Sequence, residues 1–324
     1  MRPSGEGGAA ARVAALTGIE SDRYFERTQD ALGTRYRIER TVAVSPERVL
    51  FEAHDLVLKR RVNLRVNFFT DQPTRTWFIR EAEALGRLDH PSIRHVYDAG
   101  VIGELAYRVG NWIHGEGLQG ALLRGPRPIP MVHTLARDLL SALEHAHTQS
   151  IILRRIVPAS VLLSSSGRAL VSDVRFCSYM LPVVPPGTIP LGLAYMAPEV
   201  RDGAPGDPTS DVYTAGALLY VAITGLEPPL DPTKVRRPTE LRPACPRTIE
   251  RIVLRAMQPA HDDRYLTAVE MLEDFASDAG TFETPAIAVG QGPVADAEDK
   301  ARWEKRLRRA LGDDYELLGL LGTG

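Results

Sequence analysis

Residues 153–160 read Leu-Arg-Arg-Ile-Val-Pro-Ala-Ser, and the short motifs on either side of them identify the architecture of this chain. An apolar helical pattern ends in Ala142–His147 before this stretch, and the apolar run Val161–Leu163 follows it. Three further motifs come later in the chain: Ser172-Asp173-Val174-Arg175, Ala197-Pro198-Glu199 and Ser210-Asp211-Val212-Tyr213. Each motif is modest alone, but together their order and spacing are specific.

This order of elements resembles a bacterial Ser/Thr protein kinase, in which the motifs are H-R-D-x-K-P-x-N, D-F-G, A-P-E and S-D-V-Y. The resemblance covers roughly Tyr36 to Asp274. It implies an α+β fold of two lobes, the first built of antiparallel strands and the second mainly helical. Leu153-Arg154-Arg155 stands in place of H-R-D, and Ser160 in place of the asparagine. The chain therefore looks like a degenerate member of the family, a pseudokinase.

The composition is that of a folded protein with no special affinity for polyanions. The 324 residues are 44% hydrophobic with a formal net charge of −2, which predicts neither nucleic acid nor an anionic membrane as partner. Two cysteines are too few for a disulfide framework, so we expect a reducing, cytoplasmic location. The longest apolar run, Gly216–Ile223, is far short of the roughly 20 residues that a membrane span needs.

The hydrophobic pattern predicts both strands and helices, and the composition divides the chain into four parts. Alternation over residues 36–69 predicts antiparallel strands, with breaks at 45–47 and 54–55. Helical periodicity predicts helices over 23–32, 74–88 and 131–148. The predicted organisation is a disordered leader over 1–22, a kinase-like domain over 23–275, a Gly/Ala/Pro/Thr-rich linker over 276–299, and a helix followed by a first strand over 300–324.

A short internal repeat suggests that a second domain begins near the end of this sequence. The pattern Ala-Leu-Gly-x-x-Tyr occurs at 31–36 and again at 310–315, a constant offset of 279 residues, about one kinase domain. The second copy continues into Leu321-Gly322-Thr323-Gly324, which looks like the opening of a kinase glycine-rich loop. Either the match arises by chance, or the chain is the front of a tandem protein whose downstream kinase domain is its partner.

The positions that would hold a nucleotide are altered. Alignment on the repeat places Ala43, Ser45 and Arg48 where the family has the three glycines that let backbone N–H groups approach phosphate. Arg65 takes the place of the strand lysine, a change that is not conservative in a tight site. Glu81 lies where the family has the ion-pairing glutamate, so either an Arg65–Glu81 pair forms or Glu81 is a solvated helix residue.

The catalytic positions are altered as well. Arg155 replaces the aspartate that accepts the proton of the substrate hydroxyl, and a guanidinium cannot act as a base at neutral pH. Ser160 replaces the asparagine that holds the second metal ion. Asp173 survives and could bind one Mg²⁺, although nearby arginines could neutralise it instead. No cofactor is certain, and ATP with or without magnesium stays open.

Residues that support the kinase scaffold are kept. Leu153 preserves an apolar position, Arg154 is retained from H-R-D, and Asp211 matches the residue that braces the backbone of the catalytic loop. Glu199 and Arg264 match the pair that ties the activation segment to a late helix. Residues that support the family fold are retained, whereas residues that carry out phosphoryl transfer are replaced. Random loss of sequence would not favour this difference.

Two further regions bear on ligands and partners. The hinge, Gly110-Asn111-Trp112-Ile113, leaves two alternatives open: Gly110 opens a rear pocket, or Trp112 fills the adenine region. Asn111 and Ile113 are candidate nucleotide-binding residues. The activation segment, residues 173–199, carries four prolines that would stiffen it. Thr188 and Ser178 are candidate phosphorylation sites within it.

Three functions remain open from the sequence. The first is a regulatory or scaffolding domain that docks on the downstream kinase domain without transferring phosphate. The second is an atypical or weakly active ATP-dependent transferase that uses Arg65, Asp173 and Glu81. The third is a scaffold whose arginines, Arg154 and Arg155, capture an acidic or phosphorylated peptide.

Overall fold

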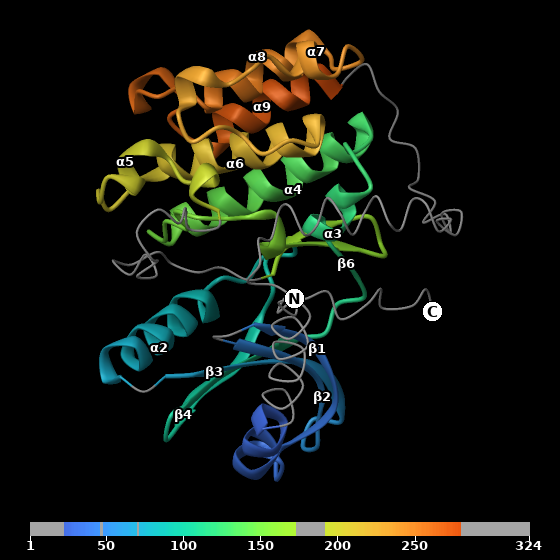
Figure 1. Cartoon of the computed structure of the whole chain (residues 1–324), viewed down its shortest axis with the longest axis vertical. Coiled ribbons are helices and arrows are strands. Elements are labelled where there is room, and N and C mark those ends of the chain that lie inside the picture. The colour runs from blue at the N-terminus through green and yellow to red at the C-terminus, as the bar shows by residue number, and fades with distance from the viewer. Residues whose placement is uncertain (1–22, 46–47, 70, 173–191, 280–324) are drawn as a thin grey trace, which may run out of the picture. The chain divides into compact units, whose positions relative to one another are not determined.

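The computed structural model describes residues 23–45, 48–69, 71–172 and 192–279. They fall into two compact units, and each is described here by itself. The first unit holds the described residues up to Glu83 together with Val96–Ile113, and the second holds Ala84–His95 and the described residues from His114 onward. Strands dominate the first unit and helices the second, so the predicted α+β fold is confirmed (Figure 1).

The first unit is built on a five-stranded antiparallel sheet in the order β1-β2-β3-β5-β4. A helix over residues 23–32 precedes the sheet, as predicted, and α2 interrupts it between β3 and β4. The elements are β1 (Tyr36–Ser45), β2 (Arg48–Asp55), β3 (Arg60–Phe68), α2 (Gln72–Gly86), β4 (Val96–Ile102) and β5 (Leu105–Asn111). The breaks predicted at 45–47 and 54–55 coincide with the ends of β1 and β2.

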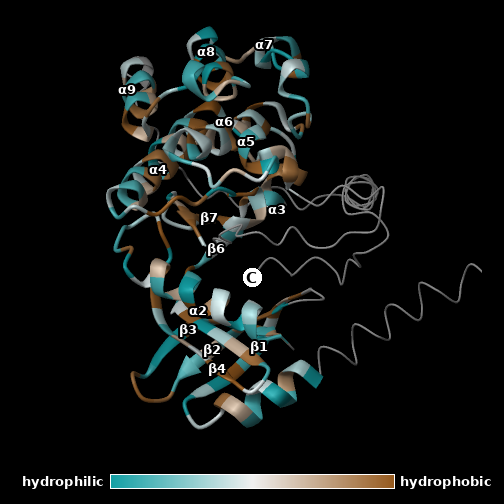
Figure 2. Ribbon diagram, turned by 90° about the vertical axis from the view of Figure 1, so that its left-hand side faces the viewer, coloured by the Kyte–Doolittle hydropathy of each residue, from teal (hydrophilic) through white to brown (hydrophobic). Residues whose placement is uncertain are grey.

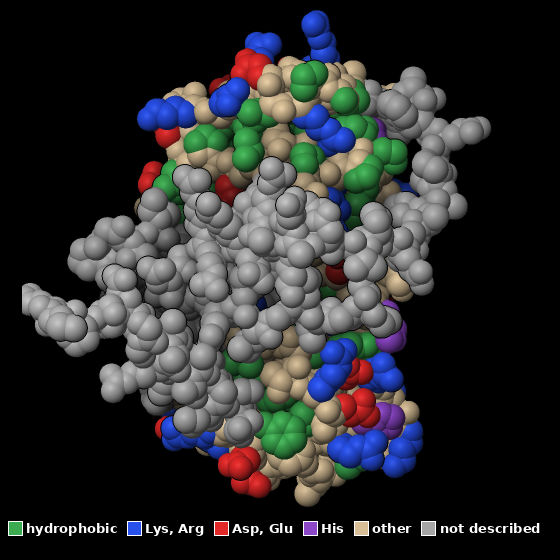
Figure 3. All heavy atoms as spheres, turned by 45° about the vertical axis from the view of Figure 1, so that its right-hand side comes forward, with side chains coloured by type: hydrophobic (Ala, Val, Ile, Leu, Met, Phe, Trp, Pro, Cys, Tyr) green, Lys and Arg blue, Asp and Glu red, His purple; other side chains and the backbone are tan. Residues whose placement is uncertain are grey.

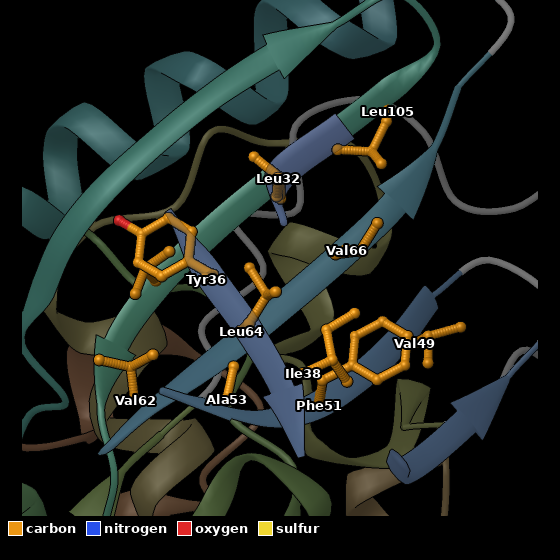
Figure 4. Close-up of a cluster of buried hydrophobic side chains, with 11 residues drawn as sticks. Leu32, Tyr36, Ile38, Val49, Phe51, Ala53, Val62, Leu64, Val66 and Leu105 are labelled. Atoms are coloured by element: carbon orange, nitrogen blue, oxygen red, sulfur yellow. The ribbon is translucent and has the colours of Figure 1, made fainter. Parts of the chain in front are cut away.

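One face of this sheet carries the apolar core, because successive side chains of a strand point to opposite faces. Alternate residues of β2 and β3, such as Phe51 and Leu64, are fully buried in a single cluster (Figure 4). The helix over 23–32 covers this face. Its Leu32 joins the cluster, and the ring of Tyr24 stacks on Phe68 with centroids 4.7 Å apart.

The opposite face of the same sheet is polar, although it is also buried. Its buried polar residues are Glu52 on β2, Asn63, Arg65 and Asn67 on β3, and Arg108 on β5. Buried polar groups require hydrogen-bond or charge partners. α2 supplies some of them here, so each face of the sheet meets a helix through a different kind of contact.

The second unit combines a small sheet with the helices. Its strands pair antiparallel in the order β6-β7-β8. The elements are β6 (Gly115–Gly117), α3 (Leu118–Leu123), α4 (Ile129–Thr148), η1 (Pro158–Ser160), β7 (Val161–Ser164), β8 (Ala169–Val171), η2 (Leu193–Tyr195), α5 (Pro198–Arg201), α6 (Pro208–Thr224), η3 (Pro232–Lys234), α7 (Pro238–Leu241), α8 (Arg247–Ala256), η4 (His261–Asp263) and α9 (Ala268–Ala279).

Helix α6 is the buried centre of this unit. Its residues from Thr209 to Thr224 are all buried, and Figure 2 shows hydrophobic colour on α6 and β7. Asp207 begins the helix as N-cap and accepts hydrogen bonds from the backbone of Thr209 and Ser210, and Gly225 ends it in the left-handed conformation. Gly216 allows the close approach of α8, because a Cβ there would lie 2.8 Å from the Cβ of Ala256.

Predicted and observed boundaries differ by a few residues. α2 begins and ends two residues before the predicted helix over 74–88, and α4 begins two residues before the predicted 131. α9 extends to Ala279, so its helix includes the start of the predicted linker over 276–299. The leader, most of the linker, the repeat after 300, and most of the activation segment with Thr188 and Ser178 lie outside the described residues. Within the described ranges, no helix is long and apolar enough to cross a membrane.

Candidate functional site

The loop at 153–160 is held by one buried carboxylate. Asp211, on the first turn of α6, accepts hydrogen bonds from the backbone nitrogens of Leu153 at 2.8 Å and Arg154 at 2.5 Å. His147 on α4 lies against the same carboxylate, with its Nε2 donating to Oδ2 at 2.9 Å. Leu153 is fully buried. The carboxylate thereby fixes the backbone at the start of the loop.

Arg154 holds the loop in an uncommon backbone conformation. Its φ is +58°, in the left-handed region that residues with a Cβ rarely adopt. Its Nε donates to the carbonyl oxygen of Pro205, and its own carbonyl accepts from the hydroxyl of Thr214 at 3.3 Å. These contacts, with the backbone bond to Asp211, offset the cost of the strained conformation. Arg154 is therefore a structural residue of the loop.

Arg155 occupies the position where the resemblance places the catalytic base. Its backbone nitrogen donates to the carbonyl of Leu153 at 2.6 Å. Its guanidinium lies beside Gly192: a Cβ on Gly192 would be 3.4 Å from Arg155 Nε and only 2.6 Å from a methyl of Val157. Gly192 has φ +85°, so this backbone approach needs a glycine. The side chain at the base position is thus a cation packed against the backbone at Gly192.

Ser160 ends the loop inside the unit. It is buried, and its carbonyl accepts hydrogen bonds from the backbone nitrogen and the hydroxyl of Ser172. Asp173, the candidate metal ligand, follows Ser172 in the sequence and lies outside the described part of the chain. Within the described part, no three His, Cys, Asp or Glu side chains come together as a metal site.

Glu199 and Arg264 form a bidentate ion pair. Arg264 Nη1 and Nη2 donate to the two carboxylate oxygens at 2.8 and 2.9 Å, and the arginine side chain is wholly buried. Burial opposes ionisation of Glu199, but hydrogen bonds from Arg264 and Ser210 outweigh it and hold the pKa of Glu199 below its usual value. The pair joins α5 to the segment before α9.

In the first unit, the three residues that stand where the family has glycines lie on the paired ends of β1 and β2. Ala43 and Ser45 lie on β1, and Arg48 begins β2 opposite Ser45 in the ladder. The backbone register is irregular beside Ala43, between Thr41 and Ala43. The structure therefore places all three substituted positions in one hairpin.

The hinge residues follow directly from β5. Asn111 is its last residue and pairs with Val62 of β3, and Ile113 follows outside the strand. The guanidinium of Arg40 on β1 lies 5.9 Å from the centre of the Trp112 ring. Trp112 is therefore packed within the first unit against a cation of the sheet.

Arg65 is buried on the polar face of the sheet. Its Nε donates to the side-chain oxygen of Asn67 at 3.1 Å, and its guanidinium lies 5.9 Å from the ring centre of Phe78 on α2. The cation that replaces the family lysine is thus engaged by neighbours in its own unit.

Glu81 has a partner that sequence reasoning missed. Arg108 Nη1 donates to Glu81 Oε1 at 3.1 Å, and both side chains are largely buried. Arg108 on β5 lies opposite Arg65 on β3, so two arginines are neighbours on one face. The signal that could have found Arg108 is its position two residues before Gly110, since alternate residues of a strand share a face.

The arrangement has a cation where the resemblance places the base, and a neutral hydroxyl where it places a metal ligand. A guanidinium stays protonated at neutral pH and offers donors only, so Arg155 can bind an anion but cannot accept a proton. The neutral hydroxyl of Ser160 is a weak ligand for Mg²⁺. The described residues therefore do not fit a Mg–ATP site of the usual kind.

Comparisons with known proteins agree with this fold. The family model described as "Protein kinase domain" matches residues 59–269. The chain is 30% identical over 277 residues to serine/threonine-protein kinase PknL of Mycobacterium tuberculosis, a match over 80% of this chain and 69% of PknL. It is 31% identical over 271 residues to a probable serine/threonine-protein kinase of Corynebacterium efficiens, covering 75% of this chain and 41% of that protein.

Two further comparisons bear on extent and fold. Serine/threonine-protein kinase PrkC of Bacillus subtilis is 27% identical over 257 residues, which cover 74% of this chain and 40% of PrkC. The matched region thus spans about two fifths of the length of the kinases from C. efficiens and B. subtilis. A solved structure titled "PpkA-294 apo form" superposes with a TM-score of 0.58 at 20% identity, covering 74% of this chain and 96% of that one.

Proposed function

Because this chain belongs to the protein kinase domain family, related to bacterial Ser/Thr kinases, we propose that it is a pseudokinase domain. In this proposal the domain does not transfer phosphate. It regulates or scaffolds a kinase domain that follows it in a longer, tandem protein.

One observation carries the proposal: a well-braced catalytic loop presents Arg155 instead of a base. Asp211 holds the loop backbone through Leu153 and Arg154, so the loop has not decayed structurally. Loss of a general base alone typically lowers a rate by about 10² to 10⁴. A cation at this position also disfavours a metal ion nearby, because like charges repel.

The first unit supports the same reading. Arg65 donates to Asn67, and Glu81 receives a hydrogen bond from Arg108. In an active kinase a lysine and a glutamate at these two positions must pair with each other to position phosphate. Glu81 thus receives a hydrogen bond from an arginine of β5, which differs from a glutamate paired with a β3 lysine alone.

Support for the tandem protein comes from the sequence. The repeat at 310–315 is followed by Gly322-Thr323-Gly324, which fits the start of a glycine-rich loop. The parent would then be a Ser/Thr kinase through its second domain, with the present domain as its regulator. The presence of only two cysteines supports a reducing compartment such as the cytoplasm.

The first test is thermal unfolding of this chain with ATP, with and without magnesium. A ligand at about 100 times its dissociation constant stabilises a protein by roughly 2.7 kcal/mol, which is visible as a shift. We expect no magnesium-dependent shift and no phosphate transfer from labelled ATP. Transfer that is abolished by Asp173→Ala would overturn the proposal.

The regulatory part needs a longer protein that contains the downstream domain. We expect deletion of residues 35–274 to change the activity of that domain, whereas Arg155→Ala should leave its regulation intact if the domain acts by docking. Unchanged activity after the deletion would contradict a regulatory role.

A further inference from the structure

Helix α8 presents a row of arginines that the proposed function does not use. Arg247, Arg251 and Arg255 are exposed, while Ile249, Ile252 and Val253 between them are buried. Residues four apart lie on the same side of a helix, so the three side chains leave α8 on one side. This set of three residues is called the arginine row below.

The surroundings of the arginine row are also basic. Residues 234–255 contain seven Lys and Arg side chains but only two Glu, a net charge of +5 in a chain whose total is −2. Figure 3 shows blue side chains standing out at the end of the unit where Figure 1 labels α7 and α8. Positive charge is therefore concentrated on this surface.

The arginine row is only partly satisfied from within the chain. Arg251 Nη1 donates to Asp274 at 3.0 Å, yet its side chain is 58% exposed. The guanidinium of Arg255 lies 4.0 Å from the ring centre of Tyr265. The side chain of Arg247 forms no hydrogen bond or ion pair with any described residue. Most of the donors of the row consequently face solvent.

The acidic residue closest in sequence to the arginine row, Glu250, is already hydrogen-bonded to another residue. Glu250 is buried, and its carboxylate accepts from the backbone and hydroxyl of Thr239 at 2.8 and 2.5 Å. Burial opposes its ionisation, but these bonds and the charges of Arg237 and Arg247 hold the pKa of Glu250 below its usual value. Exposed Arg237 adds a further cation beside Arg247, and it too has no ion pair with a described residue.

We propose that the arginine row of α8 binds an extended acidic peptide with carboxylates at every second residue, contributed by a partner protein. Four helical residues rise about 6 Å. Alternate residues of an extended strand repeat at about 6.6 to 6.8 Å. The two spacings differ by less than the reach of flexible arginine side chains, so three successive carboxylates on one side of a strand can each meet one guanidinium.

The chemistry favours a peptide over a membrane surface. Six of the seven cations between Lys234 and Arg255 are arginines, whose planar donors match carboxylates in pairs. None of the large hydrophobic side chains of α7 and α8 is exposed, so the surface lacks the apolar anchor typical of membrane-binding helices. The inference does not depend on whether the domain transfers phosphate.

The test uses the whole chain and two labelled peptides of identical composition, followed by fluorescence anisotropy at low salt. In one peptide aspartate alternates with alanine, and in the other the aspartates form one block. We expect the alternating peptide to bind more tightly. We also expect Arg247→Ala to weaken its binding about two- to fivefold, the range of an exposed ion pair. The exposed side chain of Arg247 forms no hydrogen bond or ion pair with a described residue, so the variant should fold normally.

Arg87→Ala is the matched control, because Arg87 is exposed in the same unit and forms no ion pair with a described residue. It should bind the alternating peptide like the unaltered chain. Equal binding of both peptides, or equal loss in both variants, would overturn the proposal. Anionic vesicles that bind more tightly than the peptide, or self-association lost in Arg247→Ala, would assign the surface to a membrane or a second copy instead.

Discussion

Arg108 on β5 donates to Glu81 on α2 across 3.1 Å, and the two side chains are only 8% and 15% exposed. The pair joins α2 to the polar face of the sheet. Its cation comes from β5, one strand away from the β3 position where the family carries its lysine. A buried ion pair therefore lies next to Arg65, the β3 position where the resemblance places the lysine.

A double-mutant cycle on Arg108→Ala and Glu81→Ala should reveal coupling between the two residues. Because the pair is shielded from water, we expect a coupling free energy of about 1 to 3 kcal/mol in urea unfolding. The exposed pair Arg124–Glu116, at 2.5 Å, is the control, for which about 0.2 to 1 kcal/mol is expected. Equal coupling in the two cycles would contradict a special role for Arg108.

Replacing Arg264 by methionine should be severely destabilising. The arginine side chain is fully buried, and its loss leaves Glu199 without its main partner. Breaking such a pair costs about 3 to 5 kcal/mol, to be measured as the free energy of unfolding in urea. Arg251→Ala removes a solvent-exposed pair with Asp274 and should cost about 1 kcal/mol or less. A similar small loss for Arg264→Met would show that the buried pair adds little.

Gly216→Ala should destabilise the contact between α6 and α8. The added Cβ would lie 2.8 Å from Ala256 and 2.9 Å from Met257, and such overpacking costs about 1 to 3 kcal/mol. Gly120→Ala is the matched control on α3, where a Cβ meets nothing within 4 Å. There alanine should stabilise the helix by up to about 1 kcal/mol. Thermal unfolding of the two variants should therefore shift in opposite directions.

The stability of the second unit should fall in mild acid because of His90. Burial, His145 and Arg168 lower the pKa of His90, and the charges of Asp138 and Asp89 oppose this shift only in part. A base whose pKa is lowered on folding contributes stability that is complete above its unfolded pKa, about 6.5, and is lost as the pH falls.

The geometry around His90 agrees with that sign. The backbone nitrogen of Ser92 donates to His90 Nδ1 at 3.1 Å, a bond that requires this nitrogen to be unprotonated, and Nε2 lies 3.0 Å from Ser141 Oγ. His90→Asn retains an acceptor but does not titrate. Urea unfolding between about pH 8 and pH 5 should show a weaker pH dependence in this variant than in the unaltered chain. An unchanged profile would assign the effect to other groups.

The sequence by itself determined the family fold, and it predicted which positions of the site are altered. Strand alternation over 36–69 and helical periodicity through Leu135 and Leu139 are local patterns, because they follow from the geometry of a single element. Arg155 was also readable, since its position is counted from neighbouring motifs.

Only the tertiary structure decided which side chains meet. Arg108 and Glu81 are 27 residues apart, and Gly192 lies beside Arg155 although the two are far apart in the sequence. Residues 23–32 read as a helix, but their place on the apolar face of the sheet depends on contacts with β2 and β3. A partner across the fold is chosen by register and packing of several elements at once, which no single stretch of sequence encodes.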